Sequence, residues 1–114
     1  MILRNLTAHP VVIIIGQAEF VLPAEFPTPR VLEEHTQIGT GRIDGHGVPL
    51  FELRPDVAVG LPDQKPGVGL IVARAVAVAC PGRTDLFVPF QVVRDNDGRV
   101  IACRALARIL PAGS

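Results

Sequence analysis

The stretch Val-Val-Ile-Ile-Ile-Gly-Gln-Ala-Glu-Phe-Val-Leu, residues 11–22, decides the expected fold. Residues Val11–Ile15 are all β-branched, and such side chains lose rotamer freedom in a helix but pack well on a pleated sheet. They predict a strand that is buried on both faces. Gly16 and Gln17 then predict a tight turn, after which Ala18–Leu22 forms the second strand of a hairpin.

Short apolar segments separated by turn residues continue along the 114-residue chain. Eleven prolines and eleven glycines fall between these segments and divide the sequence into many brief elements, which is typical of a β-rich protein. Further strands are expected at Arg30–Ile38, Val48–Leu53 and Val57–Leu61. Four glycines in residues 39–47 predict a flexible loop or the end of a hairpin, and residues 62–67 predict a turn.

The last third of the chain adds a helix and a second hairpin. In Gly69–Cys80 large apolar residues alternate with alanines, a pattern that suits both a strand and a helix. We expect a strand to about Ala73 and then a short helix near residues 74–80, which ends before Pro81-Gly82. Asp95-Asn96-Asp97-Gly98 predicts a hairpin turn, and the alternation in its second arm places Cys103 in the core.

Together these elements predict a single domain over residues 1–114. Its fold class is mainly β, barrel-like or sandwich-like and at the margin of α+β, with one short helix. Apolar residues make up 48% of the chain and charged residues only 19%, against about 25% in an average protein. A small sheet with one solvated face does not accommodate this excess. It predicts that the sheet closes and buries both faces, or that a second copy of the chain covers the surplus apolar surface. We expect a compact β-rich core with a subunit interface, and hence a homo-oligomer.

Composition also excludes several classes of partner. Eleven basic and eleven acidic residues cancel, so no positive field attracts nucleic acid. No apolar segment reaches the roughly 18 residues of a membrane span, and the first residues lack the features of a secretory signal, so we expect a cytoplasmic protein with no membrane partner. Cys80 and Cys103 are then expected to be reduced core residues. The only serine is Ser114, which excludes a serine nucleophile in an ordered site.

Several short motifs are distributed in order over almost the whole chain. They are Asn5-Leu6-Thr7-Ala8-His9-Pro10-Val11, Gly60-Leu61-Pro62, Ile71-Val72-Ala73-Arg74, Pro81-Gly82-Arg83-Thr84-Asp85, and Val93-Arg94-Asp95 with Gly98-Arg99-Val100-Ile101. This set resembles a family of small uncharacterised proteins of bacteriophages, prophages and actinobacteria. The chain departs from the family pattern at Ala8, Leu70, Ala73 and Phe90-Gln91, where the family carries Pro, Tyr, Ser and an acidic pair. The resemblance implies an accessory protein of phage or mobile-element origin, without a known mechanism.

The candidate site residues are mainly arginines. Ten of the eleven basic residues are Arg, whose planar guanidinium can bind a carboxylate or phosphate through two hydrogen bonds. Arg74, Arg83 and Asp85 flank the expected helix, and Arg94, Asp95 and Arg99 flank the final turn. Two interpretations stay open. Either these residues form local ion pairs and turn caps, or two or three arginines converge on an anionic ligand, with Asp85 orienting a guanidinium.

The histidines and one glycine-rich segment offer further candidates. His9 is expected at the start of a strand, where it helps Asn5 and Thr7 to fix the first turn, and it is also a ligand-binding candidate. The three histidines are spaced unlike any known metal-ligand pattern, so neither a metal nor a cofactor is predicted. Gly39-Thr40-Gly41-Arg42 has the ingredients of an anion cradle but lacks the lysine and the length of a phosphate-binding P-loop.

Three function hypotheses follow from these residues. The leading one is a non-catalytic accessory binding module that holds a small anionic ligand, for example a nucleotide-like one, or a host protein through its Arg-rich loops. The second is a self-assembling virion-associated or scaffold protein. The third is a small enzyme with His9 and Asp85 as acid and base groups, which requires a pocket that contains both side chains.

Overall fold

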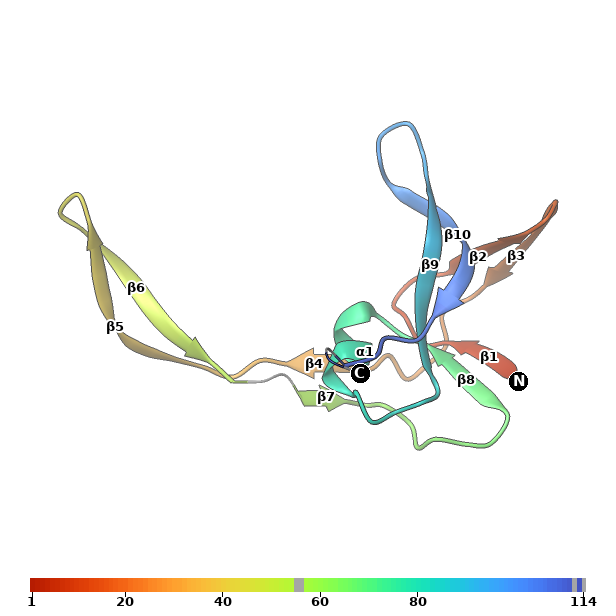
Figure 1. Ribbon diagram of the computed structural model, residues 1–114, viewed down its shortest axis with the longest axis horizontal. Helices are drawn as coiled ribbons and strands as arrows, with labels where there is room; N and C mark the ends of the chain where they lie inside the picture. Colours follow the sequence, from red (N-terminus) through yellow and green to blue (C-terminus); the bar gives the residue numbers. More distant parts are fainter. Residues whose placement is uncertain (55–56, 112, 114) are drawn as a thin grey trace.

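The computed structural model describes residues 1–54, 57–111 and 113 of the chain, so the prediction on Ser114 lies outside the described residues. It is mainly β, with one short helix (Figure 1). The predicted fold class is therefore confirmed. The elements are β1 (Ile2–Asn5), β2 (Val11–Ile15), β3 (Ala18–Leu22), β4 (Arg30–Leu32), β5 (His35–Ile43), β6 (His46–Leu53), β7 (Val57–Val59), β8 (Val68–Ile71), α1 (Arg74–Ala79), β9 (Leu86–Arg94) and β10 (Val100–Ala107). Within these ranges no helix is long and apolar enough to cross a bilayer.

Six strands form the main sheet, in the order β1-β8-β9-β10-β2-β3. Strand β8 is parallel to both of its neighbours, β1 and β9, and β10 is parallel to β2 and antiparallel to β9. Parallel neighbours need a crossover connection, and between β8 and β9 the segment with α1 provides it. The hairpins β2–β3 and β9–β10 turn at Gly16–Gln17 and at residues 95–98, as predicted.

The two edge strands of this sheet, β1 and β3, are tied together at Asn5. Its side-chain Nδ2 donates a hydrogen bond to the carbonyl of Leu22, the last residue of β3, at 2.9 Å. Just beyond β3, the backbone N–H of Glu25 donates to the Asn5 carbonyl at 2.8 Å, and the Glu25 carboxylate pairs with Arg4 at 3.2 Å. The sheet therefore curls into a half barrel whose edges meet at one end.

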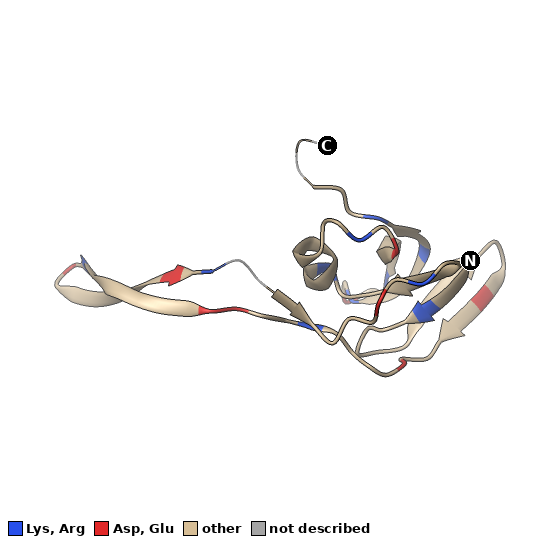
Figure 2. Cartoon of the chain, turned by 90° about the horizontal axis from the view of Figure 1, so that it is seen from below, with Lys and Arg blue, Asp and Glu red and all other residues tan. Residues whose placement is uncertain are grey.

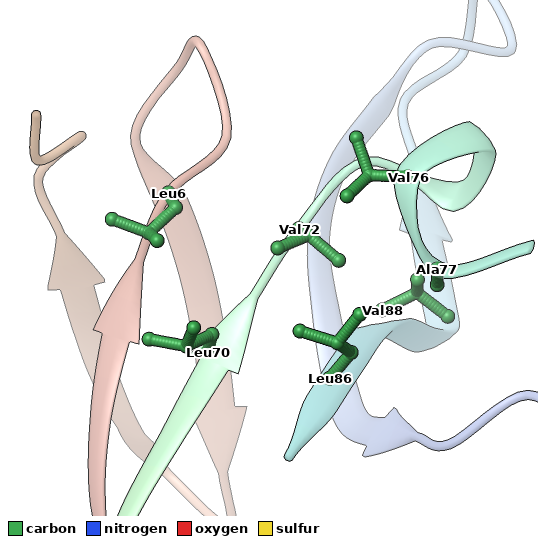
Figure 3. Packing of buried hydrophobic residues seen from close by; sticks show 7 residues of the cluster. All are labelled: Leu6, Leu70, Val72, Val76, Ala77, Leu86 and Val88. Carbon is green, nitrogen blue, oxygen red and sulfur yellow. The ribbon is translucent and has the colours of Figure 1, made fainter. Parts of the chain in front are cut away.

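Two apolar clusters lie on the two faces of the sheet. The larger one joins the end of β1, β8, α1 and β9 (Figure 3), and it consists of Leu6, Leu70, Val72, Val76, Ala77, Leu86 and Val88. The smaller one contains Ile13, Ile71 and Cys103. Leu70 and Ile71 are neighbours in β8 and contribute to different clusters, because successive side chains of a strand point to opposite faces. Strand β8 is thus buried on both faces, and Cys103 lies in the core as predicted.

Two of the expected strand environments are wrong in detail. Strand β2 is not buried on both faces, because the β2–β3 hairpin extends past the core: only Ile13 is buried, and Ile15 is 56% exposed. In β10 the register shifts between Val100 and Ala102, so Ala102 and Cys103 are both buried and Ile101 is exposed. A β-bulge of this kind interrupts the alternation that the sequence pattern assumes.

The middle of the chain differs most from the expectation. The strand expected at Arg30–Ile38 is divided by Glu33-Glu34 into β4 and β5. Gly39–Arg42 lies inside β5 rather than in a loop, so it forms no anion cradle. The turn of this hairpin is Asp44-Gly45, where both residues have positive φ, of 49° and 81°.

The β5–β6 hairpin projects away from the rest of the molecule (Figure 1). The molecule measures 59 × 38 × 31 Å with a radius of gyration of 18.1 Å, whereas a compact chain of this length has about 13 Å. At the base of the hairpin, β4 and β7 pair in antiparallel register. We call residues 33–54 the arm and the other described residues the body.

Candidate functional site

A largely apolar pocket of about 420 Å³ opens in the body. Its walls come from the turn before β2 and the start of β2 (Thr7 and His9–Val12), the segment that leads into α1 (Val72–Arg74), strand β9 (Val88, Pro89 and Val92) and strand β10 (Val100–Cys103). Small-molecule sites have volumes of about 300–1,000 Å³ and combine apolar walls with a few polar groups. This pocket matches that description, with Thr7, His9, Arg74 and the Cys103 thiol as its polar side chains.

The buried Asn5 side chain holds the first wall of the pocket in place. Its Nδ2 donates to the His9 carbonyl as well as to Leu22, both at 2.9 Å, and its Oδ1 accepts from the Thr7 backbone N–H at 3.0 Å. The Thr7 hydroxyl lies 2.6 Å from Asn5 Oδ1 and 2.8 Å from the His9 carbonyl. The prediction that Asn5 and Thr7 fix the first turn is confirmed. These bonds engage the carbonyl of His9, and His9 is exposed at the wall of the pocket.

Arg74 and His9 are the two predicted ligand-binding residues that the fold brings to this pocket. Arg74 is the first residue of α1, and its side chain is exposed. The ion pairs in the described part of the chain are Arg4–Glu25, Arg54–Glu34 and Arg83–Asp85, so they leave the Arg74 guanidinium without a carboxylate. That guanidinium is therefore available to an anionic group in the pocket.

Arg83 and Asp85 form a separate structural unit after α1. Arg83 Nε and Nη2 each donate to one carboxylate oxygen of Asp85 at 2.8 Å, and Nη2 also donates to the Pro62 carbonyl at 2.9 Å. Asp85 is buried. The hydrogen bonds between the two side chains raise the pKa of Arg83 and lower that of Asp85. This pair links the segment after α1 to the loop at Pro62, and neither residue lines the pocket.

Arg94 and Arg99 belong to the β9–β10 turn. Arg94 Nη1 donates to the Gly98 carbonyl at 2.8 Å, and Asp95 Oδ1 accepts from the backbone N–H groups of Asp97 and Arg99 at 2.9 and 3.0 Å. Such Asx bonds stabilise a turn. Of the two interpretations left open by the sequence, local pairing and turn capping therefore describes Arg83, Asp85 and Arg94.

The acid and base hypothesis required one pocket with both His9 and Asp85. The walls of the pocket include His9 but not Asp85, whose carboxylate is engaged by Arg83. Over the residues that the structure describes, no three His, Cys, Asp or Glu side chains come together as a metal site.

The two cysteines are free thiols, and Cys103 lies at the wall of the pocket. It is buried, and this burial raises the pKa of its thiol, while Cys80 at the end of α1 is half-buried. We expect iodoacetamide to modify Cys80 at least about tenfold faster than Cys103 at pH 8, because the thiolate is the reactive form. Peptide mapping by mass spectrometry measures both rates, and the difference should vanish in 6 M guanidinium chloride, the denaturing control. Faster modification of Cys103 in the folded protein would contradict this burial.

Comparison of the chain with protein-family models, curated proteins and solved structures found no match. The apolar walls of the pocket were not recognised from the sequence. Val88, Val92 and Val100 carry an ordinary strand pattern, and only the pairing of β9 with β10 beside the first turn makes them a wall. The one available signal was the Asn5–Val11 motif, which contributes four of the lining residues.

Proposed function

We propose that the protein is a non-catalytic binding module whose pocket holds a small anionic ligand with an apolar or aromatic body. The observation that carries this proposal is the 420 Å³ apolar pocket with the exposed side chains of His9 and Arg74 at its wall. The guanidinium can donate two parallel hydrogen bonds to a phosphate or carboxylate, and the imidazole offers a further donor. The aliphatic side chains of β9 and β10 suit the face of a ring, so a nucleotide-like ligand fits both parts.

The distribution of the motifs supports the same proposal. Three of the segments that carry the resemblance to small phage and prophage proteins meet at this pocket: Asn5–Val11, Ile71–Arg74 and Gly98–Ile101 all contribute lining residues. An accessory protein of a phage or mobile element that sequesters a small anionic molecule needs no catalytic group. The Arg-rich loops are not required as a whole, because Arg83 and Arg94 already have partners within the chain.

Titration calorimetry and thermal-shift measurements with nucleoside mono- and diphosphates test this function, with inorganic phosphate and the uncharged nucleosides as reference probes. We expect at least one nucleotide to bind, and Arg74→Ala to weaken binding by about 10- to 100-fold, the range for a lost charge-assisted hydrogen bond.

The matched control is Arg104→Ala, since Arg104 is an exposed arginine of β10 that does not line the pocket. It removes the same charge and is expected to leave the affinity within about twofold of the unaltered protein. Equal losses in both variants, or no binding of any anionic probe at millimolar concentration, would overturn the proposal.

A further inference from the structure

The arm has no packing partner of its own in the described chain. Strands β5 and β6 form a two-stranded sheet in which each pairs only with the other, from His35 opposite Leu53 to Ile43 opposite His46. An isolated two-stranded hairpin is marginally stable in water, and independent stability requires a third strand or a packed face. Within the described residues the other strands pair in other sheets, so the structure shows no third strand beside the arm.

Both faces of the arm carry exposed apolar side chains. The register places Phe51 and Leu53 on one face, and Leu50 on the other face with Ile43. Including Ile38, these large residues are between 45% and 64% exposed. The only aromatic contact in the arm is the edge of the His35 ring against Phe51, with ring centres 5.6 Å apart. Contiguous apolar exposure of this kind marks a surface that binds another protein.

The charges of the arm and of the body indicate that the partner of the arm is a second copy of the chain. The arm is acidic, with Glu33, Glu34, Asp44 and Glu52 against Arg42 and Arg54. The rest of the sequence carries the other seven acidic and nine basic residues, so the body is basic (Figure 2). Every copy of the chain therefore holds an acidic arm and a basic body that attract each other, and reciprocal exchange of arms closes a symmetric dimer.

The body also offers apolar surface for such an arm. On its two hairpins, β2–β3 and β9–β10, seven large side chains are 41–59% exposed, and they are Ile15, Phe20, Val21, Phe90, Val92, Val100 and Ile101. We propose that the arm is the assembly element of this protein and that it packs on the body of a second copy. The residues of the arm come from β5 and β6 and do not line the pocket, whereas Val92, Val100 and Ile101 of the body also belong to its walls.

Sedimentation velocity and light scattering of the full chain from 1 to 300 µM test this inference. We expect a dimer or larger assembly, and we expect Leu50→Asp combined with Phe51→Asp, one change on each face, to raise the dissociation constant at least about 100-fold. Phe26→Asp is the matched control, because Phe26 lies in the body and is 90% exposed. It should leave the assembly unchanged.

A milder variant guards against misfolding of the arm. Glu33→Lys combined with Glu34→Lys reverses two exposed charges and breaks only the exposed Arg54–Glu34 pair, and it is expected to weaken association about tenfold at low salt, with a smaller effect at 0.5 M NaCl. Hydrogen exchange should show concentration-dependent protection of both the arm and the β2–β3 or β9–β10 hairpin. A monomer at every concentration, an assembly unaffected by both arm variants, or protection confined to the arm would overturn the proposal.

Discussion

Replacing Asn5 with alanine is expected to lower the free energy of unfolding by about 3–5 kcal/mol. The Asn5 amide is buried and donates to the carbonyls of His9 and Leu22 while it accepts from Thr7. Its removal leaves these groups without partners in the interior, where each unsatisfied polar group costs about 1–3 kcal/mol. The change also removes the side-chain hydrogen bond from β1 to Leu22 of β3. Urea denaturation followed by circular dichroism measures the effect.

Asn96→Ala provides the comparison, because Asn96 lies exposed in the β9–β10 turn and is expected to contribute less than about 0.5 kcal/mol. Asn5→Asp should be as damaging as the alanine variant at pH 7, since it loses both donors and places a negative charge against two carbonyl oxygens. A loss of less than about 1 kcal/mol in Asn5→Ala would contradict the role given to this side chain.

Arg83→Met is expected to cost about 2–4 kcal/mol at pH 7. It removes the only ion-pair partner found for Asp85 among the described residues, and a buried carboxylate left without its partner is strongly destabilising. The Asp85 side chain is 4% exposed, and the Arg83 side chain is 23% exposed. The carboxylate is therefore the buried half of the pair. The matched control is Arg4→Met, whose partly exposed pair with Glu25 is expected to contribute about 0–1 kcal/mol.

The pH dependence of this variant has a defined sign. Hydrogen bonds from Arg83 lower the pKa of Asp85, so the pair stabilises the fold fully above the ordinary aspartate pKa, and this contribution is lost as the pH falls through the lowered value. The difference in stability between the unaltered protein and Arg83→Met should therefore be largest at pH 7 and shrink below about pH 4. Urea denaturation at pH 7, 5 and 3 measures it, and a difference that widens in acid contradicts the assignment.

Local features of the fold were predictable because short-range chemistry determines them. The β-branched run at Val11–Ile15, the turns at Gly16-Gln17 and at residues 95–98, and the end of the helix before Pro81 each depend on neighbouring residues alone. The division of Gly69–Cys80 into a strand and a helix was confirmed for the same reason, with β8 ending at Ile71 and α1 at Ala79.

Long-range pairing explains what the sequence could not show. Whether Ile15 is buried depends on how far the β2–β3 hairpin reaches beyond its neighbour β10, and no local pattern encodes that distance. The candidate arginines were identified individually, but their grouping depends on the register of β9 with β10 and on the path of α1. The apolar excess was visible in the composition, and the structure leaves many of these residues exposed on the arm and on the hairpins of the body, where no periodicity distinguishes a buried strand from an exposed one.

Pairing of β1 with β8 also has a consequence for the order in which the chain folds. Ile2 lies opposite Val68 and Asn5 opposite Ile71, so β1 pairs with a strand that follows it by more than sixty residues. The arm lies inside this long loop, and since the entropy of closing a loop grows only with the logarithm of its length, the arm adds little to that cost. The β2–β3 hairpin needs only local contacts and is expected to form early. The pairing of β1 with β8 is therefore expected to be a late step of folding.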